Sequence, residues 1–204
     1  MLLVAGATLW MGAVGFGFTY LMNYSVQAGA PALAPAQWPV ASRIPAPGGH
    51  YVLVMTLHPR CPCSRASVTE LNNLMTLLRH DDVKGYVLVM KPAEFTDEWM
   101  QTESVRSAQR IPGVTTLVDV DGVEAGRLGA QTSGQVLLYD GAGRLAFAGG
   151  LTPDRAHLGD SPGRQRILSL MKTGTADSRE SLVFGCPLGA TVCPRPAGAK
   201  NDGL

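Results

Sequence analysis

The chain has 204 residues, with 17 basic and 16 acidic side chains and a formal net charge of +1. This balance gives no field that would draw nucleic acid to the protein, so we expect no nucleic-acid partner. Charged residues make up 16% of the chain, against a usual share of about 25%. Residues 1–42 carry no charged side chain and account for the deficit. The remainder is long enough for one domain with one hydrophobic core.

The first segment of the chain, Met1–Met22, is almost wholly apolar. As a helix rising about 1.5 Å per residue, it would span the ~30 Å hydrocarbon layer of a membrane. It is longer than the roughly 7–15 apolar residues of a cleaved signal, which favours an uncleaved anchor in contact with lipid. The small residues around Val26-Gln27-Ala28 leave a cleaved signal as the alternative.

No basic residue precedes the apolar segment, and the first one after it is Arg43. The positive-inside rule therefore gives no reason for the rest of the chain to stay in the cytoplasm, and we expect it to be exported. Residues 25–48 are rich in Ala, Pro and Gly, a composition typical of a semi-extended tether.

Hydrophobic patterning beyond the tether predicts alternating strands and helices. Short apolar runs indicate buried strands, whereas apolar residues at helical spacing indicate amphipathic helices. This order predicts an α/β domain, with a mixed sheet and helices on both of its faces. In chain order we expect a strand at 51–57, a helix at 62–79, a strand at 85–91, a helix at 96–110, a strand at 113–118, a short helix at 122–128, a hairpin of 135–139 and 144–148, and a helix from Asp160 to Gly174.

Two cysteines, Cys61 and Cys63, form a Cys-Pro-Cys motif between the first strand and the first amphipathic helix. With Pro62 at the first helical position, Cys61 would be the N-cap and Cys63 would lie in the first turn. The positive end of the helix, Arg60 and a protonated His58 would all favour the thiolate form. Because a thiolate is the species that attacks disulfides, we expect exposed sulfur atoms suited to thiol–disulfide exchange.

The other two cysteines, Cys186 and Cys193, lie in the tail. A disulfide between Cys61 and Cys63 would close a tight, strained ring, and strain makes a disulfide more easily reduced. Either Cys63 or one of the tail cysteines could therefore resolve a mixed disulfide formed at Cys61. The two tail cysteines could instead pair with each other and pin a loop, since four cysteines allow three full pairings.

The local patterns HPRCPCSRAS, TSGQVLLYD and GGLTPDRAHLGD, set in this order of strands and helices, resemble the thioredoxin-like superfamily. The resemblance covers residues 48–174 and is closest to a membrane-tethered bacterial envelope branch, the RedB-type proteins related to TlpA-like proteins. It implies a thioredoxin-like mixed central sheet with flanking helices, and the apolar segment before it adds one N-terminal transmembrane helix. It also implies that Cys61 is the nucleophilic cysteine.

The sequence departs from the pattern of this family at two positions. The second cysteine of the usual Cys-x-x-Cys motif would fall at Ser64, and the family's Thr followed by a cis-proline falls on Thr132 and Ser133. A cis bond before a residue other than proline costs about 2.5–4 kcal/mol, so we predict a trans peptide before Ser133. The residues expected to support the dithiol are His58, Arg60, Pro62, Ser64, Thr132, Ser133 and His157.

These expectations together predict a membrane-anchored thiol–disulfide oxidoreductase of the cell envelope, with its domain on the periplasmic side of the inner membrane. It would need no cofactor, and its partners would be exported proteins or small thiols and disulfides. We expect a transmembrane anchor or signal segment at 1–24, a tether at 25–48, a thioredoxin-like domain at 49–174 and an irregular Cys-containing tail at 175–204.

Three other functions stay open on the sequence. Two thiolates and an imidazole suit Cu(I), so Cys61, Cys63 and His157 could form the site of a metallochaperone-like protein. A thiol peroxidase would need Pro where Val54 stands and Thr or Ser where His58 stands. A non-catalytic envelope module would tolerate replacement of the cysteines.

Overall fold

The computed structural model describes residues 2–79 and 81–190, and the chain divides into two compact units. One unit contains helix α1 (Leu2–Val26), and the other begins at Ala28. The stretch Leu3–Val26 is long and apolar enough to cross a membrane, and either a membrane anchor or a signal sequence has these properties. The prediction of an N-terminal apolar helix is confirmed.

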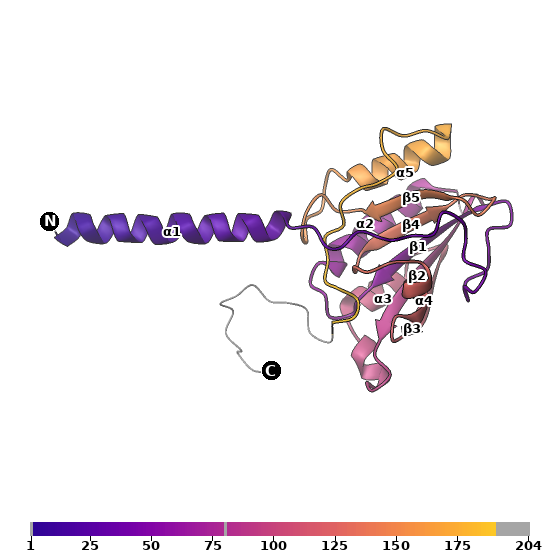
Figure 1. Ribbon diagram of the computed structural model, residues 1–204, viewed down its shortest axis with the longest axis horizontal. Coiled ribbons are helices and arrows are strands. Elements are labelled where there is room, and N and C mark those ends of the chain that lie inside the picture. The colour runs from indigo at the N-terminus through magenta and orange to yellow at the C-terminus, as the bar shows by residue number, and fades with distance from the viewer. Residues whose placement is uncertain (1, 80, 191–204) are drawn as a thin grey trace. The chain divides into compact units, whose positions relative to one another are not determined.

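A five-stranded mixed sheet forms the centre of the second unit, with the strand order β3-β2-β1-β4-β5 (Figure 1). The continuous apolar run of β1 places it in the middle, and it is buried from its second residue to its last. The first three strands are parallel, and the hairpin strands run antiparallel with β4 next to β1. This is a mixed central sheet, as the sequence predicts. The strands are β1 (Tyr51–Leu57), β2 (Val83–Lys91), β3 (Val114–Val120), β4 (Gln135–Tyr139) and β5 (Leu145–Gly150).

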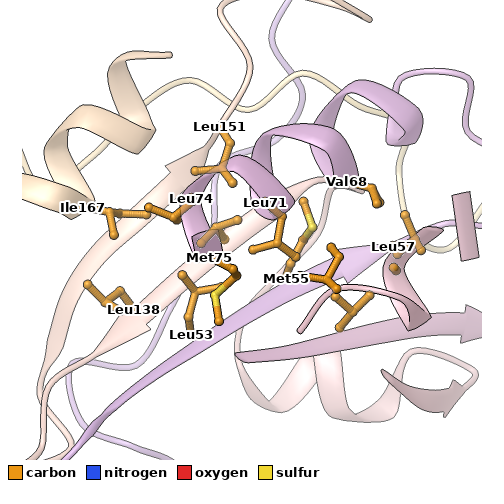
Figure 2. Close-up of a cluster of buried hydrophobic side chains, with 14 of the residues drawn as sticks. Leu53, Met55, Leu57, Val68, Leu71, Leu74, Met75, Leu138, Leu151 and Ile167 are labelled. Carbon is orange, nitrogen blue, oxygen red and sulfur yellow. The ribbon is translucent and has the colours of Figure 1, made fainter. Parts of the chain in front are cut away.

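Helices α2, α3 and α5 pack their apolar sides on one face of the sheet. Figure 2 shows part of this core, in which Leu53 and Met55 of β1 lie close to Leu71 and Met75 of α2. The packing holds α2 against β1, so the loop between these two elements has a fixed position. The helices of this unit are α2 (Ser64–Leu77), the short 3₁₀ helix η1 (Asp97–Met100), α3 (Glu103–Gln109), α4 (Val123–Arg127) and α5 (Pro162–Thr173).

The opposite face of the sheet is covered by α4 and by residues 28–50. Trp38 packs edge-on against Tyr139 of β4, with the ring centroids 5.0 Å apart. The Tyr139 hydroxyl donates a hydrogen bond to the Pro35 carbonyl oxygen (3.0 Å). The stretch that the sequence suggests as a tether thus lies on the sheet from about Gly29 onward, because its Trp and Ala side chains add to the second core.

The helix expected over 96–110 is divided into η1 and α3. Thr102 adopts an extended conformation, and its side chain accepts a hydrogen bond from the Val105 N–H (3.4 Å). A threonine in this role is an N-cap, and it starts a new helix instead of continuing the previous one. Trp99 and Val105 are buried. The predicted start and end of the last helix are also confirmed, with Ser161 as the N-cap and Gly174 as the C-cap of α5.

A buried carboxylate, Glu70 of α2, holds the loop between β5 and α5. Its Oε2 atom pairs with Arg164 Nη1, and its Oε1 atom accepts the Gly159 N–H (3.3 Å). The Glu70 side chain is 2% exposed, so a missing partner would leave a buried charge unpaired. The contact positions residues 151–160, the loop that carries Arg155.

Replacing Trp38 by Ala should lower the free energy of unfolding by about 2 kcal/mol, because the indole loses its packing against Tyr139. Val40 lies in the same segment and is fully exposed, so Val40→Ala should change stability by less than about 0.5 kcal/mol. Urea unfolding of the full chain in detergent micelles, followed by circular dichroism, measures both effects. Equal stability of the two variants would contradict the packing of residues 28–50 on the sheet.

Candidate active site

The Cys-Pro-Cys motif lies in the loop that leaves the carboxyl end of β1. The chain turns at His58, whose carbonyl oxygen accepts the Cys61 N–H (3.1 Å) and the Ser64 hydroxyl (3.1 Å). Helix α2 starts at Ser64 with Cys63 as its N-cap, two residues later than the sequence suggests. The predicted placement of Cys61 at the N-cap and Pro62 at the first helical position is therefore wrong. The reason is that the Cys63 carbonyl, which accepts the Ser67 N–H (3.3 Å), is the acceptor of the first helical turn.

Three cysteines meet at this loop and form a small buried cluster of their own. Cys61 is 2% exposed, Cys63 is 4% exposed and Cys186 is 2% exposed. The expectation of exposed sulfur atoms in Cys61 and Cys63 is therefore wrong. Pro62 between them does reach the surface. The predicted resolving candidate Cys186 is brought to the dithiol, whereas Cys193 lies outside the described residues.

The cysteines are buried by residues 183–190, which we call the cover segment. Its backbone pairs antiparallel with the loop before β4, with a bridge between Thr132 and Pro187. The Ser133 N–H donates to the Cys186 carbonyl oxygen (2.9 Å), and the Leu188 N–H donates to the Gln131 carbonyl oxygen (2.9 Å). These bonds fix the register of the cover segment and place Cys186 over the Cys-Pro-Cys loop.

Further contacts from separate parts of the chain hold the cover segment. The Gly29 N–H donates to the Val183 carbonyl oxygen (2.8 Å). Arg155 Nη1 donates to the Gly185 carbonyl oxygen (3.2 Å). These two hydrogen-bond donors lie in residues 28–50 and in the loop before α5. The position of the cover segment therefore depends on parts of the chain that are far apart in sequence.

Hydrogen bonds at the sulfur atoms distinguish the roles of Cys61 and Cys63. The sulfur of Cys61 accepts the backbone N–H of Cys186 at 3.4 Å. A hydrogen bond to Cys61, together with burial and the charge of Cys61, raises the pKa of the Cys63 thiol far above its ordinary value. The positive charge of Arg155 acts in the opposite direction on the same thiol. The raised pKa keeps the Cys63 thiol protonated, and the Cys61 sulfur is the hydrogen-bond acceptor of the pair.

His58 is fully buried beside the loop and supports it as a neutral ring. Its Nδ1 atom faces the Arg60 backbone N–H (3.2 Å), which can only donate, so Nδ1 is the acceptor. The proton is then on Nε2, which donates to the Ala190 carbonyl oxygen (2.7 Å). The expected positive charge on His58 is therefore not part of this arrangement. The Arg60 guanidinium lies 4.1 Å from the centre of the Trp99 ring, a cation–π contact.

The two positions at which the sequence departs from the family's pattern contact each other. The hydroxyls of Ser64 and Ser133 lie 2.9 Å apart, and Ser133 Oγ accepts the His58 N–H (2.8 Å). Thr132 is buried next to them, and its hydroxyl donates to the Ala30 carbonyl oxygen (2.8 Å). Across 2–79 and 81–190 every peptide bond is trans, as predicted before Ser133. Serine hydroxyls thus tie the start of α2 to the loop before β4.

The third member of the expected copper site, His157, is not brought to the cysteines. Its side chain is 64% exposed and pairs with Asp154 in the same loop. Its Nδ1 atom also lies 3.0 Å from the Arg155 carbonyl oxygen. Within the described part of the chain, no three or more His, Cys, Asp or Glu residues are grouped so that they could hold a metal ion. The arrangement of Cys61, Cys63 and His157 as metal ligands is therefore not present.

Sequence reasoning missed the cover segment and Arg155 as parts of this site. One signal in the sequence is Gly185, directly before Cys186. A Cβ atom at this position would lie 1.9 Å from the Ser133 carbonyl oxygen. Only glycine lets the cover segment approach the loop this closely. A single arginine in a loop rich in Gly and Pro carries no comparable signal.

No protein-family model matches the chain, and no curated protein matches it significantly. Among solved structures, a hypothetical protein from Sinorhizobium meliloti is 18% identical, covers 82% of this chain and 96% of its own, and has a TM-score of 0.59. An uncharacterized conserved protein from Geobacillus kaustophilus is 15% identical, covers 79% and 91%, and has a TM-score of 0.57. A secreted Mycobacterium tuberculosis disulfide oxidoreductase is 20% identical, covers 48% and 68%, and has a TM-score of 0.39. For the first two structures, the likeness at these identities concerns the fold alone.

Gly185→Ala should displace the cover segment and raise the rate of Cys61 alkylation by at least about tenfold, because the new Cβ overlaps the Ser133 carbonyl. Gly189 in the same segment is a matched control, since a Cβ there meets no atom within 4 Å. Iodoacetamide labelling of the reduced full chain, with the sites quantified by mass spectrometry, compares the two variants. Equal labelling rates would contradict the role of the cover segment in burying the dithiol.

Cys61→Ala should lower the pKa of Cys63 toward its ordinary value, because the hydrogen bond and the charge that raise it are removed. The Cys63 thiolate would then be populated at lower pH. The pH profile of Cys63 alkylation in the full chain, measured with and without the substitution in the Gly185→Ala background, tests this. An unchanged profile would show that burial alone sets the pKa of Cys63.

Proposed function

We propose that this protein is a thiol–disulfide oxidoreductase in which Cys61 is the nucleophile. The observation that carries the proposal is the hydrogen bonding of its sulfur, which accepts the Cys186 N–H at 3.4 Å and shares a hydrogen bond with Cys63. Hydrogen bonds to a sulfur favour its charged form. The thiolate is the form that attacks disulfides.

The reaction is an exchange of sulfur–sulfur bonds. The Cys61 thiolate attacks a partner disulfide, a bond forms between Cys61 and one partner sulfur, and the other partner sulfur leaves as a thiolate. A second cysteine of this chain then attacks the Cys61 sulfur, which releases the reduced partner and leaves an intramolecular disulfide. The same steps in reverse oxidise a partner dithiol.

The partners that fit this chemistry are exported proteins or small thiols and disulfides. The apolar helix α1 supports attachment to a membrane, and the absence of charge before Arg43 supports export of the second unit. We place the protein in the inner membrane as a single-pass protein of the envelope, with the dithiol on the periplasmic side. The sequence resemblance to RedB-type proteins supports the same assignment.

Cys61→Ser should lower the rate of reaction with glutathione disulfide by at least about 100-fold, because a serine hydroxyl does not attack disulfides under these conditions. The experiment mixes the reduced full chain in detergent micelles with glutathione disulfide and quantifies bound and released glutathione over time. Val40→Ala is the control, since this side chain is fully exposed and should leave the rate unchanged. A Cys61→Ser rate equal to that of the parent chain would contradict the proposed function.

A further inference from the structure

We propose that Cys186, carried by the cover segment, is the thiol that resolves the mixed disulfide at Cys61. This inference rests on the proposed function and names its second reacting residue. It starts from the contact of Cys186 with the Cys-Pro-Cys loop, where its N–H donates to the Cys61 sulfur at 3.4 Å. Cys186 and Cys61 are 125 positions apart in the chain, so only the fold brings them together.

The register of the cover segment is what delivers Cys186. A hydrogen bond joins Cys186 to Ser133, a second joins Leu188 to Gln131, and the bridge at Pro187 lies between them. A slip of one residue would turn the Cys186 side chain to the other side of the segment. The position of Cys186 over Cys61 is therefore specified by backbone pairing, as for a peptide that adds to the edge of a sheet.

Cys63 is less suited to the resolving step than Cys186. A bond from Cys61 to Cys63 would close a tight ring across Pro62, whose backbone rotation is restricted. Cys186 lies on a separate segment, so a bond from Cys61 to Cys186 would close a long loop without this local constraint.

Movement of the cover segment also accounts for release of the reduced partner from Cys61. While it is closed, it uses the backbone groups of Gln131 and Ser133 and keeps Cys61 almost without exposure. A partner disulfide can reach Cys61 only after the segment has lifted. When the segment returns, it reclaims the same backbone groups and presents Cys186 to the mixed disulfide, so resolution and displacement of the partner occur together.

With glutathione disulfide as the substrate, the resolving step transfers the Cys61 sulfur bond from glutathione to Cys186. Cys186 gives up its thiol proton to solvent, and its sulfur attacks the Cys61 sulfur of the mixed disulfide. The bond between Cys61 and glutathione breaks, and glutathione leaves as a thiolate with the bonding electron pair. The Cys61–Cys186 disulfide that forms is returned to two thiols by a reducing dithiol.

The test compares the reduced full chain, Cys186→Ser and Cys63→Ser in detergent micelles with a limiting amount of glutathione disulfide. Samples are quenched in acid at intervals, alkylated and mapped by mass spectrometry. We expect glutathione on Cys61 to accumulate at least about tenfold more in Cys186→Ser than in the parent chain. Cys63→Ser should behave like the parent chain and give a Cys61–Cys186 linkage.

A second pair of variants separates the position of Cys186 from its chemistry. Gly185→Ala keeps the thiol but should displace the segment against Ser133, so it should accumulate the same mixed disulfide as Cys186→Ser. Gly189→Ala should resolve it at the rate of the parent chain, because its new Cβ meets no neighbour within 4 Å.

Accumulation in Cys63→Ser, with a Cys61–Cys63 linkage formed in Cys186→Ser, would overturn the inference while leaving the proposed function intact. A parent chain in which Cys186 is found linked only to Cys193 would also overturn it. Absence of glutathione from Cys61 in all the chains would contradict the proposed function itself, and with it this inference.

Discussion

The backbone pairing between the cover segment and the loop before β4 determines whether the sulfur atoms of Cys61 and Cys63 are buried. Two hydrogen bonds, from Ser133 to Cys186 and from Leu188 to Gln131, hold the segment over the Cys-Pro-Cys loop. The cover segment held in this way buries Cys61 and Cys63 and brings Cys186 to the site. Strand β1 and helix α2 hold the Cys-Pro-Cys loop in place. Hydrogen bonds from Gly29 and Arg155 hold the cover segment.

The cover segment supplies a hydrogen bond to the Cys61 sulfur. Helix α2 begins at Ser64, after the motif, whereas the Cys186 N–H donates to the Cys61 sulfur and a hydrogen bond joins Cys61 to the Cys63 thiol. The Cys186 N–H belongs to the part of the chain that also blocks access. The cover segment therefore both donates a hydrogen bond to the Cys61 sulfur and keeps it almost without exposure.

Local sequence patterns predict most of the regular elements, because strand and helix periodicity depends on near neighbours. The strand at 135–139 and the end of the last helix at Gly174 are found where expected. The contacts that decide the chemistry are long-range and leave no local pattern. The burial of Cys61 depends on residues 183–190, and the packing of Trp38 depends on Tyr139. The motif itself could be found from sequence, whereas its cover and the role of Arg155 could not.

The measurement that tests the central claim most directly is a redox titration of the full chain with mapping of its disulfides. The chain is equilibrated in buffers between about −120 and −320 mV, and the sulfur linkages are identified by mass spectrometry at each potential. The account predicts a single two-electron transition in which Cys61 passes from thiol to an intramolecular disulfide. A Cys61 that stays a thiol at every potential would contradict it.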